Sequence, residues 1–363
     1  MANKDKGGDS TEEFTKVKSM SFPRTTVFGH GVLGQTSDIC DSLLFGEDGI
    51  IITGEKTYKA AGKMVEDNVS EKYNAIPVFT GGCDRANIDK AEEAAREVRA
   101  TFVLAVGGGS KIDTAKMVSK ELRIPFISIP TSIAHDGVCS DRASMKDDTG
   151  NPLTVKAEPP IAVIADTGVL VKAPYRYLAS GCADVISNKT ALTDWDLGRK
   201  VKGEEFSNSA YALANYAAES LLNDADRIKP GLEESVWLVL KPVIASGVSM
   251  CIAGTSRPTS GSEHMFSHAI DLLYPGRALH GEQTGVGCIM MTCLQGGDWK
   301  RIRDALKSIG APTTAAGIGL TPDECIEAVV KAPSVRKDRY TIFGEEGITR
   351  NRAEEIARTT GVI

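Results

Sequence analysis

Histidine is rare in this chain, and three of its five histidines, His264, His268 and His280, lie close together. His264 and His268 are four residues apart, so both imidazoles would lie on one face of a helix. His280 follows a Pro275-Gly turn, and a turn between two helices could return it to that face. Imidazoles joined by a carboxylate commonly bind zinc and leave an open position for water or substrate. The alternative is a polar helix face with a capping histidine.

The carboxylate that could complete this set is Asp184, in the segment SGCADVISN. It lies among small and apolar residues near the start of an expected helix. A carboxylate there is often an N-terminal helix charge. The alternative is a metal ligand that points into a cleft between domains.

A glycine loop follows the apolar run at 101–106 and opens an expected helix. Such a junction leaves backbone N–H groups at a positive helix end, where a pyrophosphate can bind closely. An ordinary turn between strand and helix is the alternative. The loop matches neither the GxGxxG fingerprint nor a Walker loop. Its residues are Gly107, Gly108, Gly109, Ser110 and Lys111.

A third polar cluster, PTSIAHDG, spans 130–137 and follows another apolar run. Ligands bind at the carboxyl ends of strands in open α/β sheets. Thr131 and Ser132 offer hydroxyl groups, and Asp136 offers an acceptor for substrate hydroxyls. The alternative is a loop of turn and helix-capping residues.

The elements that would position these residues differ between the two halves of the chain. Short apolar runs alternate with amphipathic stretches in the first half, which predicts an open, mostly parallel sheet with helices on both faces. The polar turn within 143–156 predicts a surface hairpin. The expected strands are 26–28, 49–53, 76–80, 101–106, 125–129 and 161–165.

Strand-like runs end near residue 171, and helical patterns follow one another. We therefore expect a dinucleotide-binding α/β domain over 1–170, with 1–20 flexible, and an all-helical metal- and substrate-binding domain over 171–363. The active site would lie in the cleft between them. The expected helices are 175–193, 205–226, 233–253, 263–273, 283–295, 300–309 and 324–331.

Composition narrows the class of protein. The 42 basic and 48 acidic residues give a net charge of −6, which argues against nucleic-acid binding. The eight cysteines show no CxxC spacing, so a zinc finger is not indicated. The polar N-terminus lacks the apolar core of a signal peptide. We expect no apolar stretch near the roughly 20 residues that cross a bilayer, hence no membrane insertion and a cytoplasmic protein.

These motifs, in this order, resemble the family of metal-dependent polyol dehydrogenases that includes glycerol dehydrogenase, iron-type alcohol dehydrogenases and 3-dehydroquinate synthase. GGGSKIDTAK at 107–116 is similar to the family's pyridine-nucleotide loop. TSIAHDGVCSDRAS, GCADVISNKTA, GSEHMFSHAIDLL and LHGEQTGVG are similar to the branch of archaeal sn-glycerol-1-phosphate dehydrogenases. The resemblance runs from about Pro23 to the C-terminus.

The resemblance implies specific roles. NAD(H) or NADP(H) would bind the glycine loop, and one zinc ion per subunit would be held by Asp184, His264 and His280. Asp136, Asp184 and His268 would contact substrate, with Asp184 and His268 catalytic. Iron-type members place a further ligand, usually histidine, at the position of Asn188, which favours zinc here. The implied cofactor residues are Gly107, Gly108, Gly109, Ser110, Lys111, Asp113, Thr131, Ser132, Ala134 and Ser140.

The implied reaction is reduction of dihydroxyacetone phosphate to sn-glycerol 1-phosphate for archaeal membrane phospholipids, by a homo-oligomer. A glycerol dehydrogenase and a lyase resembling dehydroquinate synthase are the alternatives. Glu55 and Lys56 follow the second expected strand. An acidic residue there favours NADH and a basic residue favours NADPH, so the pair leaves the choice of cofactor open. By charge alone, the substrate phosphate could bind Arg142, Lys189 or Arg257.

Overall fold

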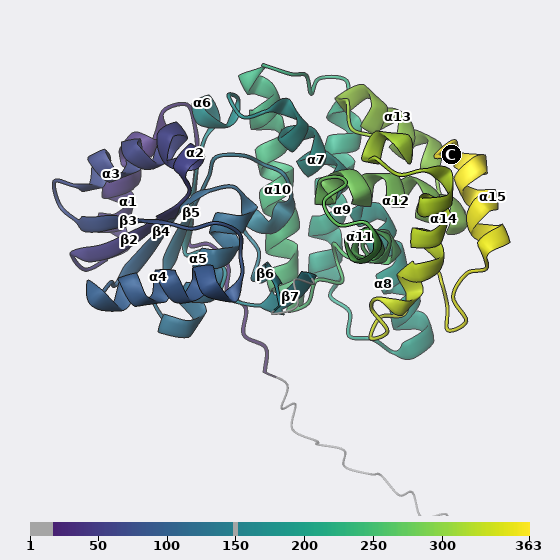
Figure 1. The fold of residues 1–363 in the computed structure, drawn as a ribbon, viewed down its shortest axis with the longest axis horizontal. Helices are drawn as coiled ribbons and strands as arrows, with labels where there is room; N and C mark the ends of the chain where they lie inside the picture. The colour runs from purple at the N-terminus through teal and green to yellow at the C-terminus, as the bar shows by residue number, and fades with distance from the viewer. Residues whose placement is uncertain (1–16, 148–151) are drawn as a thin grey trace, which may run out of the picture.

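A parallel sheet forms the N-terminal half of the molecule, as the fold prediction requires (Figure 1). The computed structural model describes residues 17–147 and 152–363, so the expectations for the first 16 residues lie outside it. All strand pairs in the sheet are parallel, in the order β1-β8-β5-β4-β2-β3. The strands are β1 (Thr25–Gly29), β2 (Asp48–Thr53), β3 (Asn74–Phe79), β4 (Phe102–Gly107), β5 (Phe126–Pro130) and β8 (Ala162–Asp166).

Both faces of this sheet are covered, which is why its strands are continuously apolar. Ile50 and Ile52 of β2 pack in one buried cluster with Ile88, while Ile51 between them packs in a second cluster with Val65. Successive side chains of a strand point to opposite faces. The helices of this half are α1 (Thr36–Ser42), α2 (Glu55–Thr57), α3 (Lys63–Val69), α4 (Arg85–Glu97) and α5 (Gly109–Leu122).

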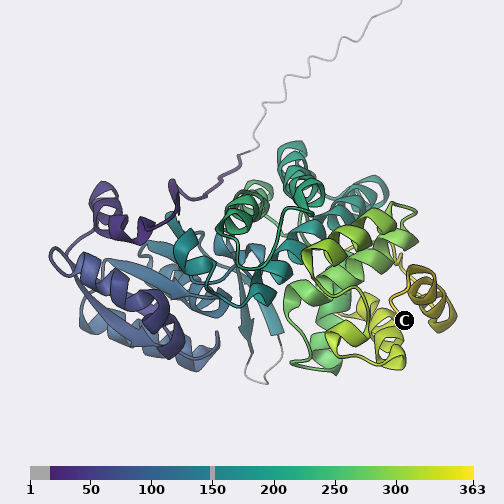
Figure 2. The same ribbon diagram turned by 90° about the horizontal axis from the view of Figure 1, so that it is seen from above.

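Helices make up the C-terminal half, seen beside the sheet from above in Figure 2. The domain boundary at 170/171 stays a prediction; short α6 (Thr167–Leu170) precedes the first long helix there. The long helices are α7 (Tyr175–Ile186), α8 (Asn188–Lys202), α9 (Asn208–Asp224), α10 (Glu233–Ala253), α11 (Ser262–Leu273), α12 (His280–Leu294), α13 (Trp299–Ile309), α14 (Pro322–Lys331) and α15 (Arg350–Thr360).

Several predicted helix bounds were wrong. The single helix expected over 175–193 is two helices that meet at Ser187, and the second continues to Lys202. α1 and α15 were not expected. The run 187–202 contains no proline that would end a helix, and its several polar residues hide the apolar stripe. The length of the helix is therefore decided by tertiary packing rather than by a visible sequence pattern.

The expectation about apolar stretches was also wrong. α10 is long and apolar enough to cross a membrane by length and composition. However, 61% of its apolar window is buried inside the protein. In Figure 1 it runs between the sheet and the other helices, and its contacts with α9 are extensive. α10 is therefore a core helix here.

A buried lysine ties α5 to the predicted hairpin, which forms β6 (Arg142–Lys146) and β7 (Pro152–Lys156). The Lys116 side chain is fully buried. Its Nζ donates to Asp113 Oδ1 at 2.9 Å and to the carbonyl oxygens of Gly137 and Arg142, each at 2.6 Å. This one ammonium group thereby fixes the glycine-loop helix, the loop after β5 and the start of the hairpin against one another.

Replacing Lys116 should therefore unfold this corner of the molecule. Lys116→Met keeps the length of the side chain but leaves Asp113 and two carbonyls without their buried donor. Removing one partner of a buried ion pair costs about 3–5 kcal/mol of unfolding free energy. Urea unfolding followed by circular dichroism measures the loss. Lys120→Met, which removes an exposed lysine on the same helix, is the control and should change stability little.

Candidate metal and cofactor site

Three side chains from three helices converge at one point of the cleft. Asp184, His264 and His280 each present a ligand atom, and these atoms lie within 4.8 Å of one another. The Nε2 atoms of His264 and His280 are 3.8 and 3.7 Å from Asp184 Oδ1. Two imidazole nitrogens and one carboxylate oxygen are a donor set that zinc takes in catalytic sites. The residues fit a metal ion, and their role as ligands stays a prediction.

Hydrogen bonds at the other ring nitrogens orient both imidazoles. His264 Nδ1 lies 2.8 Å from Glu263 Oε1, a carboxylate that can only accept when ionised. His280 Nδ1 lies 3.0 Å from Ser267 Oγ, and that hydroxyl donates to Gln283 Oε1 at 2.6 Å. His280 Nδ1 is thus the donor, and His264 Nδ1 is the donor when Glu263, whose pKa burial raises to about 7, is ionised. Each Nε2 then keeps its lone pair for a metal. Metal-binding histidines are characteristically held this way.

Asp184 lies close to the C-terminal end of α7, not near a helix start as expected. Its carboxylate therefore cannot serve as an N-terminal helix charge, and it is only 3% exposed. Asp184 Oδ2 accepts the Asp136 N–H at 3.1 Å, and Oδ1 accepts the Thr284 hydroxyl at 3.4 Å. Those two bonds turn the carboxylate towards the imidazoles.

Burial dominates the electrostatics of these groups. It raises the pKa of Asp184 to about 7 and lowers the pKa of His264 and His280 below the usual value for histidine. Burial disfavours the charged form of a carboxylate, and a nearby cation favours that form. Neutral imidazoles beside such a carboxylate offer the lone pairs that a divalent cation needs.

The residues predicted to contact substrate face the same space. His268 and Asp136 line the cleft together with the three candidate ligands. The ring of His268 is 6.3 Å from that of His264 and 6.1 Å from that of His280, and it lies outside the converging set. Asp136 Oδ2 accepts the Ser246 hydroxyl at 2.7 Å, and burial raises the pKa of Asp136 to about 7.

Asn188 does not line the cleft. Its Nδ2 donates to Ser246 Oγ at 2.9 Å, and the residue is fully buried. It thus supports Asp136 through the Ser246 hydroxyl. Whether an asparagine at this position leaves three protein ligands and favours zinc stays a prediction.

The glycine loop lies where β4 ends and α5 begins. Gly108 precedes the first helical residue, Gly109, so the first amides of α5 point out of its N-terminus. A Cβ at Gly109 would lie 2.1 Å from His135 Nε2. Burial lowers the pKa of His135 to about 4, so a neutral imidazole rests on the loop. Sequence reasoning assigned His135 no role.

The other predicted cofactor residues surround this loop unevenly. Asp113 and Ser140 line the cleft. Thr131 is buried and donates its N–H to the Gly107 carbonyl at 3.0 Å, whereas Ser132 and Ala134 are partly exposed beside the loop. Lys111 instead turns back along the sheet edge, where its Nζ donates to the Gly81 carbonyl. Roles for these residues stay predictions.

Of the phosphate candidates, Arg142 lines the cleft and Lys189 and Arg257 do not. Lys189 pairs with Glu219 at 2.9 Å, and Arg257 pairs with Glu204 at 2.8 Å. A cleft of about 210 Å³ extends from Asp113 past the imidazoles. Several residues that shape it escaped the sequence argument because their roles depend on three-dimensional neighbours; they are Glu263, Ser267, Asp271, Gln283, Thr284 and Arg336.

Comparison with known proteins agrees with this geometry. Residues 27–174 match the family described as iron-containing alcohol dehydrogenase. A probable glycerol dehydrogenase from Sinorhizobium meliloti has the same fold, with a TM-score of 0.77 at 18% identity over 95% of this chain and 98% of its own. Glycerol dehydrogenase from Schizosaccharomyces pombe gives 0.78 at 17% identity over 95% and 91%.

Closer relatives share much more sequence. The NAD(P)+ glycerol-1-phosphate dehydrogenase of Methanosarcina mazei is 49% identical over 96% of this chain and 97% of its own length. That of Pyrococcus furiosus is 45% identical over 95% and 99%. With the sheet, the glycine loop and the converging side chains in place, the chain belongs to the glycerol-1-phosphate dehydrogenase family of NAD(P)-dependent oxidoreductases.

Proposed function

We propose that this protein reduces dihydroxyacetone phosphate to sn-glycerol 1-phosphate with NADH or NADPH. The observation that supports this most is the convergence of Asp184, His264 and His280 in the cleft that begins at the glycine loop. Near-half identity over almost the whole length of named glycerol-1-phosphate dehydrogenases supports the substrate. Glycerol dehydrogenases share the fold, but their identity to this chain is under 20%, which is too low to indicate the same substrate.

Asp184, His264 and His280 would hold zinc, and Gly108 and Gly109 would hold the cofactor pyrophosphate. When bound, zinc supplies a Lewis acid that polarises the ketone oxygen, and the nicotinamide supplies the hydride. Thr284 and the Asp136 amide keep the Asp184 carboxylate in place for this.

His268 and Asp136 would handle the substrate's hydroxyl and the proton. Burial keeps the His268 pKa well below its usual value, so the ring is neutral. A neutral imidazole has one donor and one acceptor nitrogen, so it can pass a proton to the product oxygen while it takes another from solvent. Asp136, held by Ser246, would accept a hydrogen bond from the substrate hydroxyl.

We further propose that the product serves as the glycerol backbone of archaeal membrane phospholipids. Because substrate and product are small and water-soluble, the reaction suits a cytoplasmic enzyme. The resemblance to the polyol dehydrogenases supports a homo-oligomer. Light scattering of the purified protein would measure the assembly.

Two histidines of the same helix should behave differently when replaced. His264→Ala should lose bound zinc and turnover together, because it removes a ligand. His268→Ala should keep zinc and cofactor and slow turnover by roughly 10²–10⁴-fold, the usual contribution of a proton-transfer group. Elemental analysis and steady-state rates measure both. His30→Ala, at an exposed histidine outside the cleft, is the control. Zinc loss in His268→Ala would reverse the assignment.

A methyl group on the glycine loop should weaken cofactor binding and spare the fold. At Gly108 a Cβ would meet only the Ser132 hydroxyl, at 3.2 Å, whereas Gly109→Val would also displace His135. We expect Gly108→Ala to raise the Kd for NADH at least about tenfold, or about 1.4 kcal/mol. Gly34→Ala, where a Cβ meets nothing within 4 Å, is the control. Unchanged affinity would make the loop an ordinary turn.

The substrate test separates the three candidate activities. Dihydroxyacetone phosphate should be reduced far faster than dihydroxyacetone, because binding of the remote phosphate helps position the carbonyl. The product should be the sn-1 enantiomer and resist a dehydrogenase specific for sn-glycerol 3-phosphate. Equal rates would favour a glycerol dehydrogenase. A lyase would recycle its cofactor and show no steady consumption of NADH or NADPH.

A further inference from the structure

One of the two guanidinium groups in the cleft pairs, within the described residues, only with an exposed carboxylate. Among the cleft-lining residues that the structure describes, Arg142 and Arg336 are the arginines. Arg142 Nη2 donates to the Gly254 carbonyl at 2.7 Å, and its Nε lies 3.2 Å from Asp141. These contacts use Arg142 to join the hairpin to the end of α10.

Arg336 is held differently. Its Nε and Nη2 donate to the two oxygens of Asp338 at 3.2 and 3.3 Å, and Asp338 is itself 66% exposed on its side chain. The two bonds to the exposed Asp338 carboxylate fix the plane of the Arg336 guanidinium. Nη1 has no protein partner in the described part of the chain. Arg336 comes from the segment between α14 and α15 and reaches the same cleft as His264 and His268.

A hydroxyl-bearing loop lines the same cleft as this arginine. Ser256, Thr259 and Ser260 line the cleft just before α11 begins. Arg339 anchors the loop, because its Nη2 donates to Ser256 Oγ at 2.6 Å and its Nη1 to the Ser260 carbonyl at 2.7 Å. Arg339 is nearly buried and lies 4.0 Å from Asp338. Two guanidinium groups therefore share one exposed carboxylate, which leaves this wall of the cleft positive.

The positive wall adjoins the imidazoles. Burial is the main cause of the low pKa of His268; the charges of its histidine neighbours and then of Arg336 and Arg339 lower it further. An anionic group joined to a carbonyl near His268 would thus lie in the same cleft as Arg336. Arginine is suited to such a group because its planar fork matches phosphate oxygens.

We propose that Arg336, with the hydroxyls of Ser256 and Thr259, binds the phosphate of the substrate and so selects phosphorylated over free ketones. This rests on the proposed function. The arginine acts as a binding residue at the end of the substrate away from the carbonyl. Its binding energy positions the carbonyl against the candidate metal ligands.

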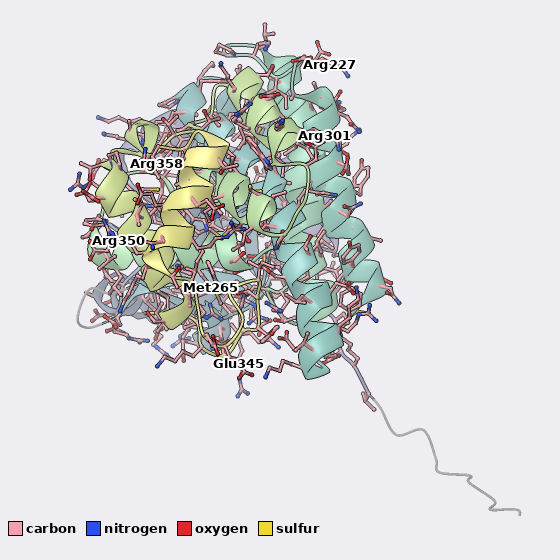
Figure 3. The ribbon with its side chains drawn as sticks, turned by 90° about the vertical axis from the view of Figure 1, so that its right-hand side faces the viewer. Arg227, Met265, Arg301, Glu345, Arg350 and Arg358 are labelled. Atoms are coloured by element: carbon pink, nitrogen blue, oxygen red, sulfur yellow. The ribbon has the colours of Figure 1, made fainter. Side chains whose placement is uncertain are left out.

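Substrate pairs test the assignment in the zinc-loaded holoenzyme. Arg336→Gln should lower kcat/KM for dihydroxyacetone phosphate on the order of 10²-fold, as expected when a charged hydrogen-bonding partner is removed. Its kcat/KM for dihydroxyacetone should fall far less. Arg336→Lys should be intermediate, because it keeps the charge and loses the fork. Arg358→Gln is the matched control: this exposed arginine lies on α15 (Figure 3) and pairs with Glu354.

Binding of inorganic phosphate provides a readout apart from turnover. Calorimetry should show that orthophosphate binds the wild-type holoenzyme and is displaced by dihydroxyacetone phosphate, and that Arg336→Gln loses this binding. Asp338→Asn, which keeps Arg336 and removes its exposed partner, should bind orthophosphate at least as well. If Arg336→Gln does not fold, Arg336→Lys takes its place and should bind orthophosphate more weakly than the wild type, because it loses the fork.

Three results would overturn the assignment. They are parallel losses with both ketones in Arg336→Gln, unchanged selectivity in that variant, and loss of orthophosphate binding in Asp338→Asn as large as in Arg336→Gln. The last would show that the ion pair holds the loop. If the wild-type enzyme fails to reduce dihydroxyacetone phosphate, the proposed function fails instead, and orthophosphate binding alone then decides the role of Arg336.

Discussion

The buried carboxylate of Asp184 is the constraint around which the site is built. A carboxylate that is 3% exposed is costly unless hydrogen bonds or a cation compensate it. Here the loop after β5 gives the Asp136 amide, α12 gives the Thr284 hydroxyl, and two imidazoles face the same oxygen. Asp184 is therefore the point at which the edge of the sheet and the helices are held together, and it is also where a cation would stabilise the charged form.

The imidazoles depend on a further layer of contacts. Glu263 holds His264, and its neighbour Gly261 donates an N–H to the same oxygen at 2.8 Å. Asp194 of α8 accepts the Ser262 N–H at 2.7 Å and so fixes where α11 starts. The direction of the His264 ring follows from that start, because side chains on a helix inherit their positions from its first turn. A one-residue shift of α11 would turn the ligand face away from Asp184.

Local patterns predicted the sheet and the glycine loop because continuous apolar runs and a strand–glycine–helix junction are local signals. They also predicted that His264 and His268 share one helix face, and that a turn could bring His280 beside it, since both depend only on helix spacing and one turn. They misplaced Asp184 on its helix, because the break at Ser187 depends on packing. Local patterns did not indicate the contact between His135 and Gly109 or the role of Asn188, because both depend on residues distant in sequence.

The fold and the loops determine different parts of the site. Proteins that share under 20% of this sequence have the same fold, so the fold itself places the glycine loop beside a set of helices. The walls of the cleft come from less regular segments, such as the loop before α11 and the segment that carries Arg336 and Arg339. Arg339 holds the first of these segments through its bonds to Ser256 and Ser260, and the second also packs Phe343 into the core. Substrate choice can therefore change in such walls while the buried carboxylate and its two imidazoles stay in place.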